Sequence, residues 1–95
     1  MNMKYFDWNI EKNKKLKKER GVSFEEVVLT MKSGGLLHTH KNPNIEKYPN
    51  QKIFVVYIND YIFTIPFVED EEKYFLKTII PSRKATKKYG KIQIK

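Results

Sequence analysis

Two runs of β-branched and aromatic residues, at positions 52–58 and 61–68, are separated only by Asn59 and Asp60. Asn and Asp tolerate the left-handed backbone of a two-residue turn, so this pattern predicts a β-hairpin. Pairing across the turn opposes Ile58 to Tyr61 and gives the hairpin two unequal faces. The strongly apolar face carries Phe54, Val56, Ile58, Tyr61, Phe63 and Ile65. The milder face carries Val55, Tyr57, Ile62 and Thr64. Other elements of the chain must therefore cover the apolar face.

A short aromatic strand and a helix are predicted before the hairpin. Residues 4–8 read Lys-Tyr-Phe-Asp-Trp, which favours a strand that ends at a polar turn. Residues 10–20 lack Pro and Gly and are rich in Lys and Glu, so they favour a helix. Asn9 can cap the start of this helix, and Gly21 can supply the positive φ that ends it.

A second helix is predicted directly after Gly21. Ser23 followed three residues later by Glu26 is a capping box, in which each side chain binds the backbone N–H of the other residue. The spacing of the apolar residues from Phe24 onward puts them on one side of a helix over 24–32. Gly34 and Gly35 then end it.

The remaining segments are a loop, a strand and a basic helix. Residues 36–51 hold two His, two Pro and three Asn, which predicts mostly loop, although a short strand could begin at Leu36 and Leu37. Residues 74–80 predict a further strand that follows an acidic turn. After Pro81 and Ser82 we expect a short helix over 83–89 and a flexible tail at 91–95.

Composition excludes several classes of protein. A chain of 95 residues with six Phe, six Tyr and one Trp can build one small core, so we expect a single domain over residues 1–95. The absence of cysteine excludes disulfides, thiolate zinc sites, iron–sulfur clusters and cysteine nucleophiles. Apolar runs such as 53–58 are far shorter than the ~20 residues of a membrane helix. No apolar N-terminal segment resembles a signal peptide, so we expect a cytoplasmic protein without membrane contact.

Positive charge is concentrated at the two ends of the chain. Residues 1–20 hold seven Lys or Arg against three acids, and residues 81–95 hold six against none, within a net charge of +8. Residues 61–80 are acidic by two charges. If the two basic ends meet in space, they form one positive face suited to nucleic acid or to an acidic protein. Solvation by a lysine-rich surface is the alternative interpretation.

Two stretches of the sequence resemble a known family in combination. The first comprises Phe6-Asp-Trp-Asn, Lys12 and Gly21-Val-Ser-Phe-Glu-Glu26, and the second is Ile79-Ile-Pro-Ser-Arg-Lys-Ala-Thr86. Together they resemble the BrnT family of bacterial toxins, within the RelE/ParE-like superfamily. The resemblance spans nearly the whole chain. It implies an α+β fold with an N-terminal strand, two helices, a three- or four-stranded antiparallel sheet and a short C-terminal helix.

The resemblance also implies a function and a partner. BrnT-like toxins belong to type II toxin–antitoxin pairs, and they act on RNA to stop translation. It therefore implies an endoribonuclease that acts on RNA, free or on the ribosome. It also implies a DNA-binding antitoxin, of the ribbon-helix-helix type or similar, that neutralises the toxin. We expect no cofactor. Two alternatives are a ParE-like binding module directed at a protein, and a degenerate toxin that retains only antitoxin binding.

Cleavage of RNA without a metal requires a base, an acid and a cation beside the phosphate that is attacked by the 2′-OH. Arg83 is the first candidate for the cation, because a guanidinium donates two hydrogen bonds to phosphate and stays charged. Lys77 could stabilise the phosphate or move a proton from within its strand. Tyr89 could stack on a base or donate a proton. Each of these side chains could instead have a purely structural or solvated role.

Two histidines and four lysines complete the candidate site. His38 and His40 alternate, so both point to one side if their segment is extended, and histidine changes protonation near neutral pH. One of them could act as base or acid. No third ligand lies near them at suitable spacing, so we expect no metal site. Lys52 stands where the family often has arginine. Contacts with RNA phosphates are expected for Lys52, Lys84, Lys87 and Lys88.

Overall fold

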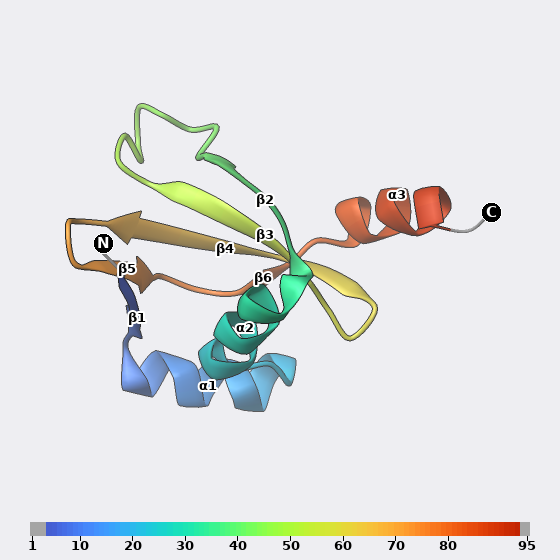
Figure 1. The fold of residues 1–95 in the computed structure, drawn as a ribbon, viewed down its shortest axis with the longest axis horizontal. Helices are drawn as coiled ribbons and strands as arrows, with labels where there is room; N and C mark the ends of the chain where they lie inside the picture. The colour runs from blue at the N-terminus through green and yellow to red at the C-terminus, as the bar shows by residue number, and fades with distance from the viewer. Residues whose placement is uncertain (1–3, 94–95) are drawn as a thin grey trace.

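A mixed β-sheet organises the chain, of which the computed structural model describes residues 4–93. In chain order its strands are β1 (Tyr5–Trp8), β2 (Leu36–Lys41), β3 (Lys52–Ile58), β4 (Tyr61–Glu69), β5 (Lys73–Leu76) and β6 (Ile80–Pro81). Their order across the sheet is β1-β5-β4-β3-β2, and β6 pairs with another part of β4 (Figure 1). β1 runs parallel to β5, and the other described pairs are antiparallel. The predicted α+β class is confirmed. The expected antiparallel sheet of three or four strands is wrong, since the described sheet has six strands and is mixed.

The β3–β4 hairpin has the predicted turn and register. Asn59 and Asp60 have φ values of 52° and 64°, the left-handed conformations that a two-residue hairpin turn of this kind requires. Ile58 opposes Tyr61, and Val56 opposes Phe63. The predicted apolar face is therefore correct, and it forms the sheet side of the hydrophobic core.

Helices α1 (Ile10–Arg20) and α2 (Phe24–Thr30) cover that apolar face. Both begin at the predicted caps: Asn9 Oδ1 accepts the N–H of Lys12, and Ser23 and Glu26 form the capping box. Gly21 ends α1 with a φ of 72°. The helices contribute Leu16, Phe24 and Val27 to the core, and the connection between them contributes Val22; all four are almost fully buried.

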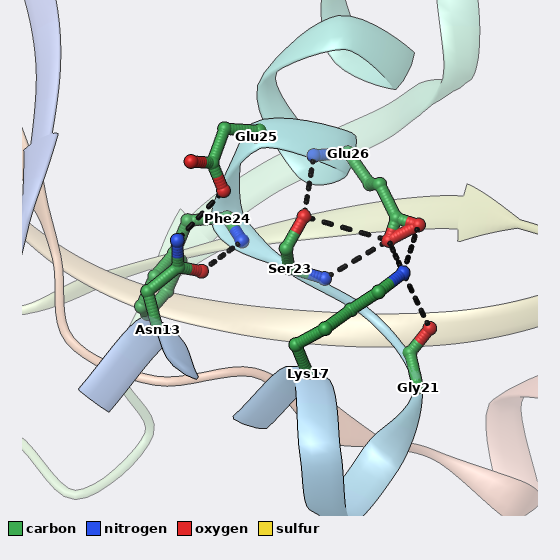
Figure 2. Close-up of polar contacts among 7 residues, drawn as sticks. All are labelled: Asn13, Lys17, Gly21, Ser23, Phe24, Glu25 and Glu26. Atoms are coloured by element: carbon green, nitrogen blue, oxygen red, sulfur yellow. Dashed lines mark hydrogen bonds and ion pairs between the residues drawn. The ribbon is translucent and has the colours of Figure 1, made fainter. Parts of the chain in front are cut away.

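Polar side chains fix the angle between α1 and α2 (Figure 2). Asn13 Oδ1 accepts the N–H of Phe24 at 2.7 Å, and Asn13 Nδ2 donates to Glu25 Oε1 at 2.7 Å. Lys17 Nζ lies 3.1 Å from Glu26 Oε2 and also donates to the carbonyl of Gly21. The weakly apolar α1 is therefore held to α2 by hydrogen bonds as well as by Leu16.

The segment after α2 differs from the prediction. α2 ends at Thr30, and a single wide turn, η1 (Met31–Gly35), replaces the predicted last helical residues because Gly34 adopts a φ of 97°. Leu36–Lys41 then forms strand β2 against β3, where the sequence predicts mostly loop. The strand does begin at Leu36, as the sequence allowed, but the loop prediction is wrong for residues 38–41, since pairing with β3 overrides their polar composition. Residues 42–51 form the predicted irregular connection.

The predicted strand over 74–80 is divided into β5 and β6. The carbonyl oxygen of Pro66 in β4 accepts the N–H of Lys77 at 2.8 Å. Proline has no N–H, so Pro66 cannot donate the second hydrogen bond that would continue the pairing of the two strands. Pairing on this side of β4 resumes at Thr64, which opposes Ile80. Ile79 lies between the two short strands and is fully buried. The interruption therefore has its cause on the adjacent strand.

Helix α3 (Arg83–Gln93) follows β6 and projects beside the β3–β4 hairpin, away from β1 and α1 (Figure 1). It continues past the predicted end at Tyr89, and residues 94 and 95 of the predicted tail lie outside the described residues. The basic residues of α1 and α3 consequently occupy two surfaces. The condition for one positive face, that the two basic ends meet in space, is not met by α1 and α3, because α1 packs under the sheet and α3 projects away from it.

Candidate nucleic-acid interface

The start of α3 is hydrogen-bonded to the backbone of Ile62, near the start of β4. Ser82 N–H donates to the Ile62 carbonyl at 2.9 Å, and Ile62 N–H donates to Thr86 Oγ1 at 2.8 Å. Thr86 Oγ1 donates in turn to the carbonyl of Ser82 at 2.7 Å, and Ser82 Oγ caps the helix by accepting the N–H of Ala85. The side chain of Thr86 thus binds the strand edge where β6 has ended. This arrangement places Arg83 at the first residue of α3.

Four cations follow one another along the solvent side of α3. Arg83 and Lys87 are one turn apart, as are Lys84 and Lys88, so the four share one side of the helix. All four are exposed, and none pairs with a carboxylate in the described part of the chain. Their charges are therefore available to an anionic partner, as a phosphate-binding surface requires.

Tyr89 lies on the sheet side of α3 and packs against Tyr57 of β3. Their ring centroids are 4.9 Å apart, and both side chains are half-buried. Tyr57 Oη donates to Asp60 at 3.1 Å, and this hydrogen bond raises the pKa of the Tyr57 phenol. The sequence places Tyr57 only on the milder face of the hairpin; its contact with Tyr89 depends on the position of α3.

His38 and His40 lie side by side on β2 at the edge of the sheet. Their ring centroids are 5.4 Å apart, both side chains are exposed, and His40 Nδ1 lies 2.8 Å from the carbonyl oxygen of Lys41. Both are paired with β3 residues of the face away from the core, His38 with Val55 and His40 with Ile53. The two histidines therefore share this outer face, as expected if their segment is extended.

A row of paired residues connects His38 with the β6 end of the sheet. Val55 is opposite Thr64, and Thr64 is opposite Ile80, which precedes α3. Three strand spacings separate the backbones of His38 and Ile80, a distance of about 14 Å. A histidine and Arg83 must therefore reach toward each other across this row to contact one phosphate.

Lys77 lies elsewhere, beside the first turns of α1. Its ammonium is 5.6 Å from the centre of the Phe75 ring. Together with Lys12 and Lys15 of α1 it lines a shallow hollow. The structure therefore groups Lys77 with lysines of α1 and separates it from Arg83. Lys77 directly follows β5 and lies in no strand, so the prediction that it sits within a strand is wrong. Only the parallel pairing of β1 with β5, which the sequence does not reveal, brings the start of α1 beside it.

Lys52 is engaged in an ion-pair network at the far end of β3. Its Nζ lies 2.8 Å from Glu69 Oε1, and the other carboxylate oxygen of Glu69 binds Lys4. The hydrogen bonds from Lys4 and Lys52 lower the pKa of Glu69 below its ordinary value. Lys52 is paired with Phe67, five residues along β4 from Ile62, so it stands well away from the start of α3.

Among residues 4–93 there is no group of three or more His, Asp or Glu side chains that could hold a metal ion. No helix in the same range is long and apolar enough to cross a membrane. Comparison of the chain with protein-family models, with curated proteins and with solved structures gives no match.

Proposed function

We propose that the protein is a BrnT-like toxin of a type II toxin–antitoxin pair, and that it cleaves RNA without a metal ion. In this proposal it acts in the cytoplasm and inhibits translation. A DNA-binding antitoxin, of the ribbon-helix-helix type or similar, neutralises it. The outer face of the sheet and the cationic side of α3 form the surface for RNA.

The observation that carries the proposal is that the two BrnT-like stretches meet in the fold. Within the first stretch, the rings of Trp8 and Phe24 stack with centroids 5.6 Å apart. Arg20, directly before its Gly21, donates from its guanidinium to the carbonyl oxygen of Ile79, where the second stretch begins. Val22 and Phe24 of the first stretch also share the hydrophobic core with Ile79 of the second. The two stretches therefore belong to one packed unit, which leads into α3 and Arg83.

The proposed chemistry assigns one role to each kind of side chain. The 2′-oxygen bonds to phosphorus as its proton is removed, and the bond from phosphorus to the 5′-oxygen breaks as that oxygen takes up a proton. Arg83 neutralises the phosphate during this step, and the other cations of α3 hold neighbouring phosphates. His38 or His40 takes or gives the proton, because imidazole is the side chain best suited to proton transfer near neutral pH. Tyr89, packed on Tyr57, stacks on a nucleobase of the RNA beside α3 or supplies a proton.

The test combines growth in cells with cleavage in vitro. Expression of this gene alone is expected to arrest growth and translation, and co-expression of the antitoxin encoded beside it is expected to restore both. Purified protein should cleave RNA in the presence of a metal chelator, with or without ribosomes. Normal growth at high expression together with intact RNA in both assays would refute the toxin proposal.

A second candidate is a non-enzymatic binding module with the same fold, directed at a protein as in the ParE branch, or a degenerate toxin that only binds its antitoxin. The spacing of about 14 Å between the His38 and Ile80 backbones favours it, since the catalytic candidates do not converge. RNA binding or antitoxin binding without any cleavage would select this candidate.

A further inference from the structure

A second cationic surface lies at the junction of β5 and α1. The hollow there is lined by Asn9, Glu11, Lys12, Lys15, Phe75 and Lys77. Three ammonium groups and one carboxylate leave this small surface strongly positive. Lys12, Lys15 and Lys77 form no ion pair with any carboxylate in the described part of the chain.

The three lysines are arranged so that an anion would relieve their repulsion. Lys12 and Lys15 are neighbours on one side of α1, where like charges destabilise a helix. Lys77 adds a third positive charge from the other wall of the hollow. The backbone N–H of Lys12 is not free to bind an anion, because it already donates to Asn9 Oδ1. The attraction for an anion would therefore come from the ammonium groups.

Phe75 gives the hollow an apolar wall. Its side chain is half-buried, and the ammonium groups of Lys77 and Lys73 lie 5.6 Å and 5.9 Å from its ring centre. Lys73 is itself paired with Asp7, at 3.4 Å, so it contributes less free charge than Lys77. Proteins bind single-stranded nucleic acid with this combination of an aromatic ring and unpaired lysines: a base stacks on the ring, and the phosphate contacts the cations.

We infer that this hollow is a nucleotide subsite for single-stranded RNA, in which Lys12, Lys15 and Lys77 contact phosphate and Phe75 stacks on a base. The inference rests on the proposed function and adds a contact surface separate from α3. It also gives Lys77 a binding role that does not depend on Arg83.

The experiment measures binding of a fluorescently labelled oligouridylate by anisotropy at several salt concentrations. The double variant Lys12→Gln/Lys15→Gln should bind about 20-fold more weakly at about 0.1 M salt, with a salt slope smaller by about 1.4, since each phosphate contact on a single strand contributes about 0.7. Phe75→Leu should weaken binding by about fivefold or more and leave the salt slope unchanged.

The matched control is Lys14→Gln/Lys18→Gln. It removes the same charge from the same helix, but these two lysines line a different hollow, with Ser23 and Glu25. Glutamine has a helix propensity close to that of lysine, so both double variants should fold like the parent. Binding of the control variant should fall by less than about twofold, because distant exposed charges are screened.

Equal losses for the two double variants would overturn the inference, and so would an unaltered affinity of Phe75→Leu. Binding of an acidic peptide with the same sensitivity to Lys12 and Lys15, but none to Phe75, would replace RNA by a protein partner. If the parent binds no oligouridylate at all, the proposed function fails first. Titration with uridine monophosphate then tests the nucleotide subsite by itself. Shifts of the Phe75 ring signals in NMR spectra support the subsite, and unchanged signals refute it.

Discussion

Arg83 has the central role in the proposed chemistry, and its surroundings allow it to be substituted without disturbing the fold. It is exposed at the first residue of α3, and its position depends on backbone and side-chain groups of Ser82 and Thr86 rather than on its own charge. A surface arginine without a carboxylate partner contributes little to the stability of the fold. Changes at Arg83 therefore report on function.

We predict that Arg83→Ala lowers RNA cleavage by about a hundredfold, the usual loss when one charge-stabilising donor is removed. Arg83→Lys should recover only part of the rate, because a point charge cannot reproduce the two-pronged contact. Initial rates on a defined RNA measure both variants, with circular dichroism to verify folding. His38→Ala and His40→Ala are compared beside them, since loss of one limb of the pH–rate profile identifies the proton carrier. Cleavage by Arg83→Ala at the parent rate would remove Arg83 from the catalytic site.

Glu69 makes the stability of the fold depend on pH. The hydrogen bonds from Lys4 and Lys52 hold its pKa below the ordinary value of 4.5, so the folded protein favours the ionised carboxylate more than the unfolded chain does. This contribution is complete above about pH 4.5 and is lost as pH falls through the lowered pKa. Glu69→Gln should therefore be less stable than the parent at pH 7. Thermal unfolding from pH 7 to pH 3 should show the two proteins converging, and a constant difference would contradict the assignment.

At the scale of elements, the attachment of α3 depends on Thr86. Ile62 is almost fully buried, and its N–H has the Thr86 hydroxyl as its acceptor. Thr86→Val keeps the shape but removes this acceptor, so it should lower the free energy of unfolding by about 1–3 kcal/mol. Thr86→Ser keeps the acceptor and should lose clearly less.

Urea unfolding measures the stability of the two Thr86 variants, and amide hydrogen exchange at Ile62 measures the local contact. The valine variant should exchange faster at Ile62 than the serine variant. Equal stability and equal exchange in the two variants would mean that the hydroxyl does not attach α3 to β4.

The elements that the sequence predicts correctly are those whose signals are local. The turn at Asn59 and Asp60, the cap at Asn9, the end at Gly21 and the capping box from Ser23 all act within a few residues of the chain. Each of these features can therefore be predicted from residues that are neighbours in the sequence.

The incorrect predictions concern pairing between distant segments. β2 is polar and becomes a strand only because β3 offers it hydrogen bonds, while the strand expected over 74–80 is interrupted by Pro66 of β4. The candidate site follows the same rule. The shared face of His38 and His40 follows from alternation, whereas the grouping of Lys77 with Lys12 requires the parallel β1–β5 pairing.

At the scale of the whole molecule, two kinds of exposed surface are available to the proposed antitoxin. One is the cationic side of α3, in a protein of net charge +8. The other is apolar: Leu29 of α2 is 67% exposed, and Leu36 at the start of the edge strand β2 is 38% exposed. These surfaces differ in the physical force that would hold a partner, and salt separates them.

We predict that the antitoxin covers the cationic side of α3 with an acidic segment, because this also blocks the proposed RNA surface. The dissociation constant, measured by calorimetry, should rise steeply with salt. Salt screens the attraction between exposed charges, and the screening length falls from about 10 Å at about 0.1 M to about 3 Å at about 1 M. The triple variant Lys84→Gln/Lys87→Gln/Lys88→Gln should bind weakly and with little salt dependence, whereas Leu29→Glu should bind like the parent. Affinity that is insensitive to salt and is lost in Leu29→Glu would instead place the antitoxin on the apolar surface beside β2, leaving α3 free in the complex.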